Sequence, residues 1–300
     1  MSNNTSKWLM GCGIGCGVLI MLIIIVVATG YFFVKDKITN LKELEESSEI
    51  LEEKYGSVRD FCPAPDGSIK AERIEAFLSV RDSLALIREE MTRSIGSITD
   101  NIQRAEREEE SFWNVLTIIR KGVGAIPQLF EYYKVRNEAL LQAEMGLGEY
   151  YYIYVIAYYS WLGKSPEDGP KFQLMGGDNR RYRFEWDEED ITDENSHSSY
   201  EENVKEERRY RIIRRVQRMF LPMLRCQLNQ LKESSSIRFK QSWQKALTTE
   251  IETLENKSQR LPWQDGLPDV IKASLNPFRE QLKASYSAML NPVELSGQSR

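Results

Sequence analysis

The sequence predicts a mainly α-helical protein: a single N-terminal transmembrane helix followed by an all-α helical domain. Residues 8–34 contain no charged side chain, in a chain of which 28% is charged. Over most of the remaining sequence, apolar side chains recur at steps of three and four residues, which is the spacing of one helix face. Apolar and polar residues alternate, as in a strand, only near residues 171–186, where we expect a small β-hairpin.

The composition narrows the classes of protein to consider. The 300 residues are 41% hydrophobic with a net charge of −5, and a mean hydropathy of −0.47 excludes a protein with many membrane spans. The negative charge argues against a general nucleic-acid binder. One histidine and four cysteines are few for zinc binding or histidine-based catalysis, and no phosphate loop, dinucleotide fingerprint or HExxH motif occurs. We therefore assign no catalytic residue and expect no cofactor and no metal.

The N-terminal segment is long and apolar enough to be a membrane anchor. Residues 8–34 exceed the roughly 20 residues that cross a bilayer core as a helix. Nine of the residues in Val18–Val27 are Leu, Ile or Val, and together they favour insertion by about 3 to 5 kcal/mol. We predict a short tail over residues 1–7 and a retained anchor over 8–34. The alternative is a signal peptide that is cleaved near Ala28-Thr29-Gly30.

The start of the anchor carries four alternating glycines. Glycine lets two transmembrane helices approach closely, so these residues are compatible with a homodimer that packs through the anchor. The alternative, which we favour, is that they reflect the high frequency of glycine in membrane helices. The four residues are Gly11, Gly13, Gly15 and Gly17.

The charges beside the anchor leave its orientation open. Lysines after the anchor favour a cytoplasmic C-terminal domain, whereas a basic residue, an apolar core and small residues in that order are typical of export. We take the second alternative and expect a single-pass protein whose C-terminal domain is extracytoplasmic. There Cys62 and Cys226 are able to form a disulfide, although the sequence does not show whether they lie within reach.

A helical stalk is predicted over residues 35–55, and a soluble helical domain over 56–300. Pro63 and Pro65 oppose helix formation in the connector at the start of this domain. A long amphipathic run follows from Ile74 to Ile102, with apolar residues at steps of three and four. The later helical runs span residues 128–145, 239–254 and 269–290.

The most aromatic segment, Tyr150–Gly163, is predicted to be a buried helix. It has 14 uncharged residues, which is too few to span a membrane, and six of them are tyrosines. The tyrosines fill the core or, in the alternative that we rank second, line a ligand pocket. In that pocket Glu149 is the polar contact, and Tyr151, Tyr154 and Tyr158 form the wall.

An acidic stretch comes next along the chain. Residues 185–207 hold eleven acidic side chains and one lysine, and a run of this kind usually stays solvated. We therefore predict an acidic flexible loop over about 164–207. The single histidine, His197, lies in this stretch and is interpreted as an exposed loop residue.

Six arginines follow the acidic stretch without an intervening acid. On a helical wheel nearly all of them lie opposite the apolar residues of the same run. They form a basic surface for anionic lipid headgroups or nucleic acid, or, as we favour, they pair with the acidic loop or face water. Pro222 is expected to kink or divide this helix. The candidate contacts with an anionic surface are Arg208, Arg211, Arg215 and Arg218.

Short strings spread over most of the chain carry a family resemblance. They are Lys7-Trp8-Leu9-Met10-Gly11-Cys12-Gly13, Pro65-Asp66-Gly67, Phe77-Leu78-Ser79-Val80-Arg81, Gly148-Glu149-Tyr150, Ala157-Tyr158-Tyr159-Ser160-Trp161-Leu162 and Leu261-Pro262-Trp263. The chain resembles an uncharacterised bacterial family of N-terminally membrane-anchored, helical proteins of unknown function. The resemblance implies an anchor in the bacterial cytoplasmic membrane and a helical domain, and it implies no activity. The acidic stretch looks like an insertion.

Three hypotheses of function come from different classes. The leading one is a membrane-tethered helical interaction or structural module of the bacterial cell envelope, with no catalytic activity. Its partners are the lipid bilayer and another envelope protein, and no nucleic acid is expected. The alternative is a ligand-binding or sensory domain that uses the tyrosine-rich pocket. A carboxylate-based enzyme ranks last, because no pair of acids is singled out.

Overall fold

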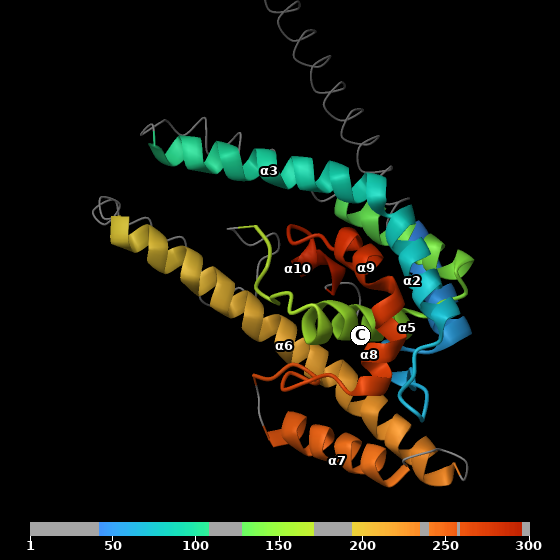
Figure 1. Ribbon diagram of the computed structural model, residues 1–300. Coiled ribbons are helices and arrows are strands. Elements are labelled where there is room, and N and C mark those ends of the chain that lie inside the picture. The colour runs from blue at the N-terminus through green and yellow to red at the C-terminus, as the bar shows by residue number, and fades with distance from the viewer. Residues whose placement is uncertain (1–41, 108–127, 171–193, 235–239, 257–258, 296–300) are drawn as a thin grey trace, which may run out of the picture. The chain divides into compact units, whose positions relative to one another are not determined.

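The computed structural model describes residues 42–107, 128–170, 194–234, 240–256 and 259–295 (Figure 1). All regular elements in these ranges are helical, so the all-α prediction is confirmed for the described part of the chain. Ser47–Arg300 form one compact unit, and the residues before Ser47 form a second unit.

Several predictions lie outside the described residues. These are the tail, the anchor with its four glycines, and the β-hairpin at residues 171–186. Among the helices that are described, none is both long and apolar enough to cross a membrane. Residues 42–55, at the end of the predicted stalk, are helical.

The amphipathic run forms two helices, α2 (Ala71–Ser83) and α3 (Ala85–Arg107), where the spacing predicted one. They are separated at Leu84, whose side chain is fully buried. Across this break Arg88 Nη2 donates a hydrogen bond to the carbonyl of Arg81 at 2.8 Å. An arginine side chain thus satisfies a backbone acceptor beside the interruption, which is where the helical hydrogen-bond ladder is weakest.

The tyrosine-rich segment forms the centre of the fold. Helix α5 (Leu147–Tyr154) continues directly into a π-helical turn, η2 (Val155–Trp161), and its side chains from Tyr150 to Tyr159 are buried. Helix α2 contacts both α5 and α9 (Arg279–Ser285), and α9 also contacts η2. Figure 1 shows α5 in the middle of these helices. The prediction of a buried helix is therefore confirmed.

Helix α6 (Glu194–Glu233) begins earlier than the sequence predicted. The acidic loop expected over about 164–207 is wrong from Glu194 onwards, and His197 lies on a helix. Acidic side chains near the start of a helix are stabilised by its dipole, and Val204 is 3% exposed, so the first part of α6 has its own core contact. Pro222 lies inside α6 and does not divide it.

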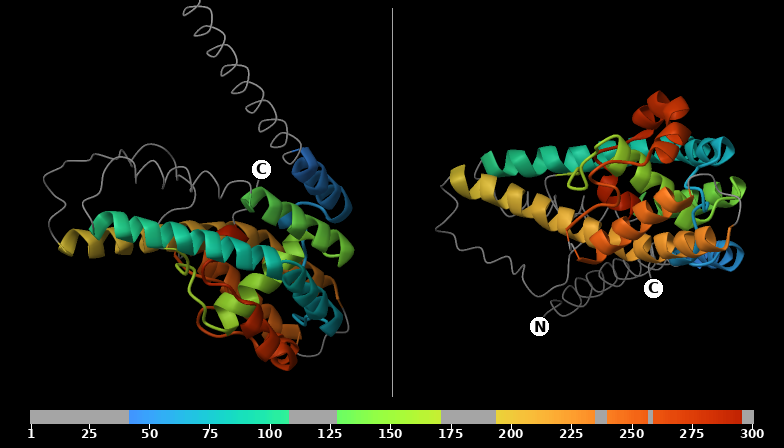
Figure 2. Two further views of the ribbon diagram at one scale, coloured as in Figure 1. Left: turned by 90° about the horizontal axis from the view of Figure 1, so that it is seen from above. Right: turned by 60° about the horizontal axis from the view of Figure 1, so that its bottom comes forward.

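The C-terminal helices complete the unit. Helix α7 (Lys240–Asn256) packs along α6 (Figures 1 and 2). The helices α8 (Asp269–Leu275) and α10 (Asn291–Glu294) are short, and α9 lies between them in the sequence. A 3-10 turn, η1 (Val58–Asp60), contacts both α5 and α6.

A disulfide joins the connector to α6. It links Cys62 and Cys226, whose Cα atoms are 5.5 Å apart although 164 residues separate them in sequence. This Cα distance is within the usual range for a disulfide. The two cysteines that the sequence left as a potential pair are therefore bonded.

Candidate functional site: a buried tyrosine cluster around an ion pair

A fully buried ion pair lies in the core. The side chains of Arg81 in α2 and Glu294 in α10 are both 0% exposed, and Arg81 Nη1 donates to Glu294 Oε1. Arg81 Nη2 also donates to the carbonyl of Ser285 at 2.6 Å. Removing two charges from water costs several kcal/mol for each ion, roughly, and only close pairing with further hydrogen bonds offsets this cost.

Tyrosine hydroxyls satisfy the other oxygen of Glu294. The hydroxyl of Tyr132 donates to Oε2 at 2.5 Å, and that of Tyr150 donates to the same oxygen at 3.1 Å. Tyr150 also accepts from Arg81 Nη1 at 3.0 Å. Both oxygens of the carboxylate thus have hydrogen-bond donors from the protein. We call the following residues, with Arg81 and Glu294, the tyrosine cluster: Tyr132, Tyr150, Tyr154, Tyr158 and Tyr159.

The π-helical turn explains how two tyrosines five residues apart donate hydrogen bonds to the same acceptor. In an α-helix such positions point about 140° apart, and the wider turn of a π-helix reduces this angle. Tyr154 and Tyr159 accordingly both donate to Asn291 Oδ1, at 3.1 and 2.7 Å. The amide of Asn291 donates in turn to the carbonyls of Pro166 and Asp168, both at 3.1 Å. The start of α10 is therefore fixed to two other parts of the chain.

Burial and pairing set the protonation of the cluster. Burial raises the pKa of Tyr132 and Tyr154, so their hydroxyls stay protonated and donate. Burial alone would also raise the pKa of Glu294, but Arg81 and the hydrogen bond from Tyr132 outweigh it and lower that pKa. The cluster thus holds one cation, one anion and neutral donors. Such an arrangement stabilises the fold, and none of the groups in the tyrosine cluster is placed to accept a proton from a substrate.

The predicted pocket residues have different environments in the structure. Glu149 pairs with Arg73 of α2, with Oε2 and Nη2 2.6 Å apart. Tyr154 and Tyr158 belong to the tyrosine cluster, and Tyr151 accepts a hydrogen bond from Arg136 at 3.1 Å. These three tyrosines are at most 1% exposed, which favours the core over the pocket.

Arg136 is a second buried cation, with 2% of its surface exposed. Within the described ranges its contacts are neutral: the Tyr151 hydroxyl, the Asn137 side-chain oxygen at 3.4 Å, and the ring of Tyr133, whose centroid lies 4.9 Å away. A guanidinium over an aromatic face is stabilised by the ring quadrupole. The polar core therefore extends from the tyrosine cluster toward the helix at residues 128–142.

The four predicted anionic-surface arginines are likewise not equivalent. Arg208 is buried and donates to the carbonyls of Glu167 and Pro170, so it does not face an external anion. The remaining three have different exposures: Arg211 and Arg218 are exposed and Arg215 is half-buried.

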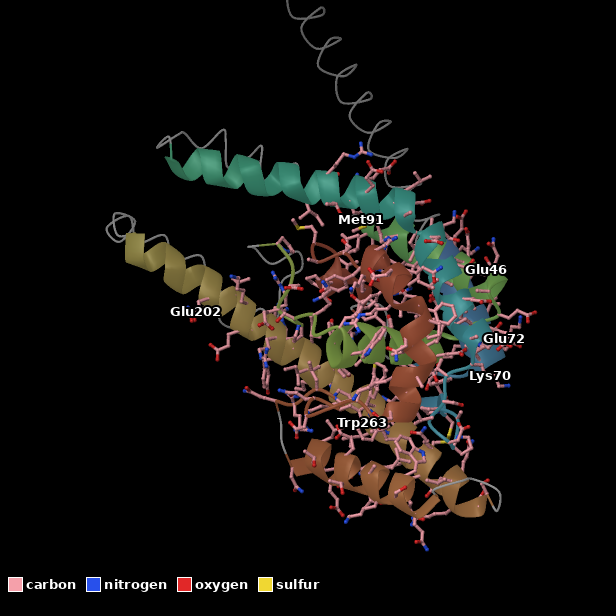
Figure 3. All side chains as sticks on the ribbon, in the orientation of Figure 1. Glu46, Lys70, Glu72, Met91, Glu202 and Trp263 are labelled. Atoms are coloured by element: carbon pink, nitrogen blue, oxygen red, sulfur yellow. A yellow bond between two sulfur atoms is a disulfide. The ribbon has the colours of Figure 1, made fainter. Side chains whose placement is uncertain are left out.

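A second buried polar group fixes the chain before α8. Glu250 of α7 accepts from the backbone N–H of Trp263 at 2.7 Å and lies 3.6 Å from Arg260, which also pairs with Asp265 at 2.6 Å. Trp263, which is labelled in Figure 3, has a φ of +55°. Its ring stacks on that of Trp243, with ring centroids 5.8 Å apart. Burial raises the pKa of Glu250 more than the hydrogen bond from Trp263 and the charge of Arg260 lower it.

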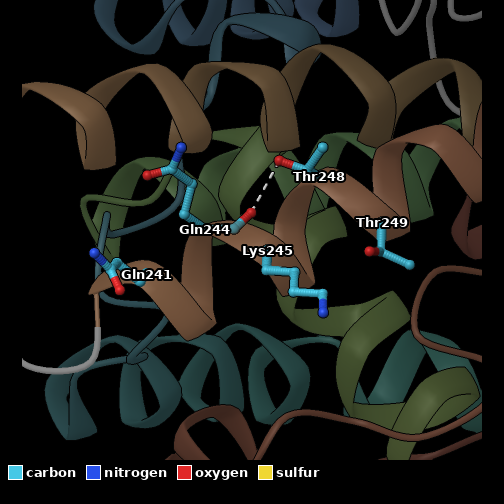
Figure 4. A pocket seen from close by; sticks show the side chains of 5 residues that line it. All are labelled: Gln241, Gln244, Lys245, Thr248 and Thr249. Carbon is cyan, nitrogen blue, oxygen red and sulfur yellow. Dashed lines mark hydrogen bonds between the residues drawn. The ribbon is translucent and has the colours of Figure 1, made fainter.

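A hollow on the surface follows one face of α7 (Figure 4). The described residues that line it all belong to that helix, and the Thr248 hydroxyl donates to the carbonyl of Gln244 at 2.9 Å. A ligand there would remain largely in water, so we assign no site to it. The lining residues are Gln241, Gln244, Lys245, Thr248 and Thr249. Among the described residues, no group of three or more potential ligands is arranged to hold a metal ion.

The sequence did not identify the charged and amide residues that bind the tyrosines of the cluster. Arg81 and Arg88 occupy positions in the apolar spacing of the run from Ile74 onwards, and this was the available signal. Asn291 and Glu294 carry no comparable signal. Comparison of the chain with family models, with curated proteins and with solved structures gives no match. The described geometry defines a disulfide-bonded all-α domain whose C-terminal turn is locked into a buried polar core.

Proposed function

We propose that this protein is a membrane-tethered helical module of the bacterial cell envelope, whose domain lies outside the cytoplasm and binds or braces another envelope protein. The disulfide between Cys62 and Cys226 is the observation that carries the proposal. Disulfides persist in oxidising compartments and are rare in the cytoplasm. Combined with the uncharged segment at residues 8–34, the disulfide supports an anchored protein with an exported domain.

The position of the disulfide also supports a structural role. Cys62 follows the predicted stalk, and Cys226 lies well inside α6. In the chain-entropy model, closing a loop of this length stabilises the folded state by about 5 kcal/mol. A force that reaches the domain through its stalk is thus transmitted covalently to its longest described helix.

The chemistry of the core favours binding or bracing over catalysis. Protein groups satisfy the carboxylate of Glu294, and burial keeps the surrounding tyrosine hydroxyls protonated. A catalytic acid or base must reach its substrate and exchange a proton near the working pH. The tyrosine cluster has neither property, because its side chains are buried.

Thiol labelling tests the compartment. The full chain, with Cys12 and Cys16 replaced by serine, is treated in intact spheroplasts with a membrane-impermeant maleimide-polyethylene glycol. We expect adducts at Cys62 and Cys226 only after an external reductant is added, and none in the C62S/C226S variant. Labelling without reductant, or labelling only after lysis, would contradict an exported disulfide-bonded domain.

Crosslinking tests the interaction. Intact membranes that contain the tagged full chain are crosslinked, and the chain is purified under denaturing conditions. We expect a defined partner that is not recovered with a tagged anchor and stalk alone. Recovery of the same proteins in both samples would argue against an interaction module.

A further inference from the structure

We infer that the bond between Cys62 and Cys226 is a reversible redox site in the folded domain. A dithiol protein of the thiol–disulfide oxidoreductase class opens and closes this bond, and the surrounding chain keeps its structure when the bond is open. This goes beyond the proposed function, in which the disulfide is a permanent link, and it does not depend on the identity of the envelope partner.

Non-covalent contacts hold the connector on both sides of its cysteine. Directly before the cysteine, the ring of Phe61 packs on that of Tyr152 in α5, with centroids 5.5 Å apart. Two residues after the cysteine, the carbonyl of Ala64 accepts a hydrogen bond at 2.6 Å from Nε2 of Gln227, which directly follows the second cysteine in α6. Neither contact involves a sulfur atom, so both persist when the bond between the cysteines is open.

The rest of the connector is attached to two further helices. Trp243 of α7 donates from Nε1 to the carbonyl of Pro65 at 2.9 Å, and a Cβ added at Gly67 would lie 2.5 Å from the ring of Trp243. The backbone N–H of Ile69 donates to the hydroxyl of Ser274 in α8 at 3.0 Å. Side chains of α6, α7 and α8 thus fix the backbone of the connector independently of the disulfide.

Neither cysteine is sealed inside the core. Both are half-buried, whereas the side chains of the tyrosine cluster are buried. A cysteine that is buried in apolar surroundings is chemically inert, and a partly exposed one is open to thiol–disulfide exchange. The bond therefore lies where a protein dithiol reaches it without unfolding the domain.

Opening the bond is a two-electron reduction. A thiolate of the oxidoreductase attacks one sulfur atom of the bond, which forms a mixed disulfide and releases the other sulfur as a thiolate. The second thiolate of the oxidoreductase then breaks the mixed disulfide and forms a disulfide within the oxidoreductase. The two hydrogen atoms of its dithiol end on the two cysteines of this chain. Closing follows the same steps in reverse, with an oxidised member of the class as the electron acceptor.

The fold and the bond stabilise each other by the same factor, because the two equilibria are linked. In the chain-entropy model, a bond between cysteines 164 residues apart shifts the folding equilibrium by a factor of roughly 10³ to 10⁴. The equilibrium constant for closing the bond should therefore be larger by this factor in the folded domain than in the unfolded chain.

Hydrogen–deuterium exchange tests whether the connector stays docked. The full chain in nanodiscs, with Cys12 and Cys16 replaced by serine, is measured in its oxidised form and after reduction with dithiothreitol. We expect exchange in peptides that span residues 61–70 to change less than about fivefold on reduction, because the side chains of α6, α7 and α8 still hold the connector. A larger increase would overturn the inference, since the bond itself would then be what holds the connector.

Two matched variants test the contacts that position the cysteines. Q227A/S274A removes one donor to the connector and one acceptor from it. Q230A/S79A changes the same residue types at exposed positions. In the reduced form we expect connector exchange to rise at least about tenfold in the test variant and less than about twofold in the control. Equal exchange in the two reduced variants would overturn the inference. Near-UV circular dichroism verifies that both variants are folded.

Thioredoxin, a dithiol protein, is the probe for the redox reaction. Catalytic amounts of it should speed reduction of the folded chain by dithiothreitol at least about tenfold, as they do for insulin disulfides measured in parallel. Equilibration of the detergent-solubilised chain in glutathione buffers should give an equilibrium constant for closing that is at least about 100-fold larger in native buffer than in concentrated urea. No acceleration by thioredoxin, or a smaller ratio, would overturn the inference.

These measurements on the purified chain are independent of where the domain lies in the cell. Exported thiols and a specific crosslinked partner, combined with a connector that is released on reduction, would overturn the redox site alone. A connector that stays docked and a bond that thioredoxin opens, combined with cytoplasmic thiols, would support the redox site and overturn the proposed location.

Discussion

Neutralising Glu294 should strongly destabilise the domain. The variant Glu294→Gln keeps the shape of the side chain but leaves Arg81 buried without an anion, and both side chains are 0% exposed. Leaving one member of a buried ion pair uncompensated costs about 3–5 kcal/mol. The hydroxyl of Tyr132 also loses a charged acceptor at 2.5 Å. We expect the free energy of unfolding to fall by about 4 kcal/mol, within the range for such pairs.

Urea denaturation of the full chain in detergent measures this loss. Near-UV circular dichroism is the appropriate signal, because the buried tyrosines report on tertiary packing. At about 2–4 °C for each kcal/mol in a domain of this size, the melting temperature should fall by about 8–16 °C. Glu280→Gln is the control: it removes an exposed ion pair with Lys283 and should leave the denaturation midpoint unchanged.

The double variant R81M/E294M separates the ion pair from the packing around it. It removes both charges, so no charge is left buried alone, and stability should recover by at least about 2 kcal/mol relative to E294Q. The reasoning would be refuted if E294Q unfolded at the wild-type midpoint. It would also be refuted if the double variant were less stable than E294Q.

Three further changes test other parts of the fold. Cys226→Ser should lower the urea midpoint by an amount equivalent to at most about 5 kcal/mol, and a reductant should then have no further effect. Gly148→Ala should lower the melting temperature, because its Cβ would lie 2.6 Å from the carbonyl oxygen of Val58, whereas Gly96→Ala, with nothing within 4 Å, should raise stability by about 0.5–1 kcal/mol. Burial raises the pKa of Glu250, so the folded state keeps this proton to higher pH than the unfolded chain does; stability from this group is lost as pH rises through the folded pKa. Glu250→Gln should remove that decline from urea midpoints measured on both sides of the transition.

The local sequence pattern was sufficient to predict that the run from Ile74 is helical and which of its residues are buried, but it did not predict the break at Leu84. Phe77, Leu84 and Met91 recur at steps of seven residues, which is two helical turns, and all three are buried as this spacing predicts. The tyrosine-rich segment was also predictable, because 14 uncharged residues are too few for a membrane span and too apolar for a surface. In both cases the residues that determine helix formation and burial lie within about twenty adjacent positions.

The buried arginines had a signal that periodicity alone misreads. Arg81 lies four residues after Phe77 and three before Leu84, and it therefore occupies a core position of the same face. A charge there is ordinarily interpreted as the edge of the apolar face. In this fold it marks a buried cation, and its acceptor, Glu294, lies 213 residues away in the sequence. No local pattern identifies that acceptor.

The acidic start of α6 illustrates the opposite error. Composition favoured a loop, because eleven acids over residues 185–207 repel one another. The helix nevertheless begins at Glu194, where one negative charge in the first turn is favourable, and Val204 further along it is buried. The average composition of this segment therefore predicted its secondary structure incorrectly from Glu194 onwards.

The C-terminal turn depends on the tyrosine cluster for its structure, and the cluster depends on the turn. Helix α10 has four residues, far fewer than an isolated helix needs in water. Two of its residues, Asn291 and Glu294, are nevertheless wholly buried, and they accept from four tyrosine hydroxyls and from Arg81. Without the turn, the four hydroxyls would lose these acceptors, and the guanidinium of Arg81 would be buried without its anion. Without these donors, the four-residue helix would lack the contacts that stabilise it. The C-terminal turn and the tyrosine cluster are therefore expected to form cooperatively.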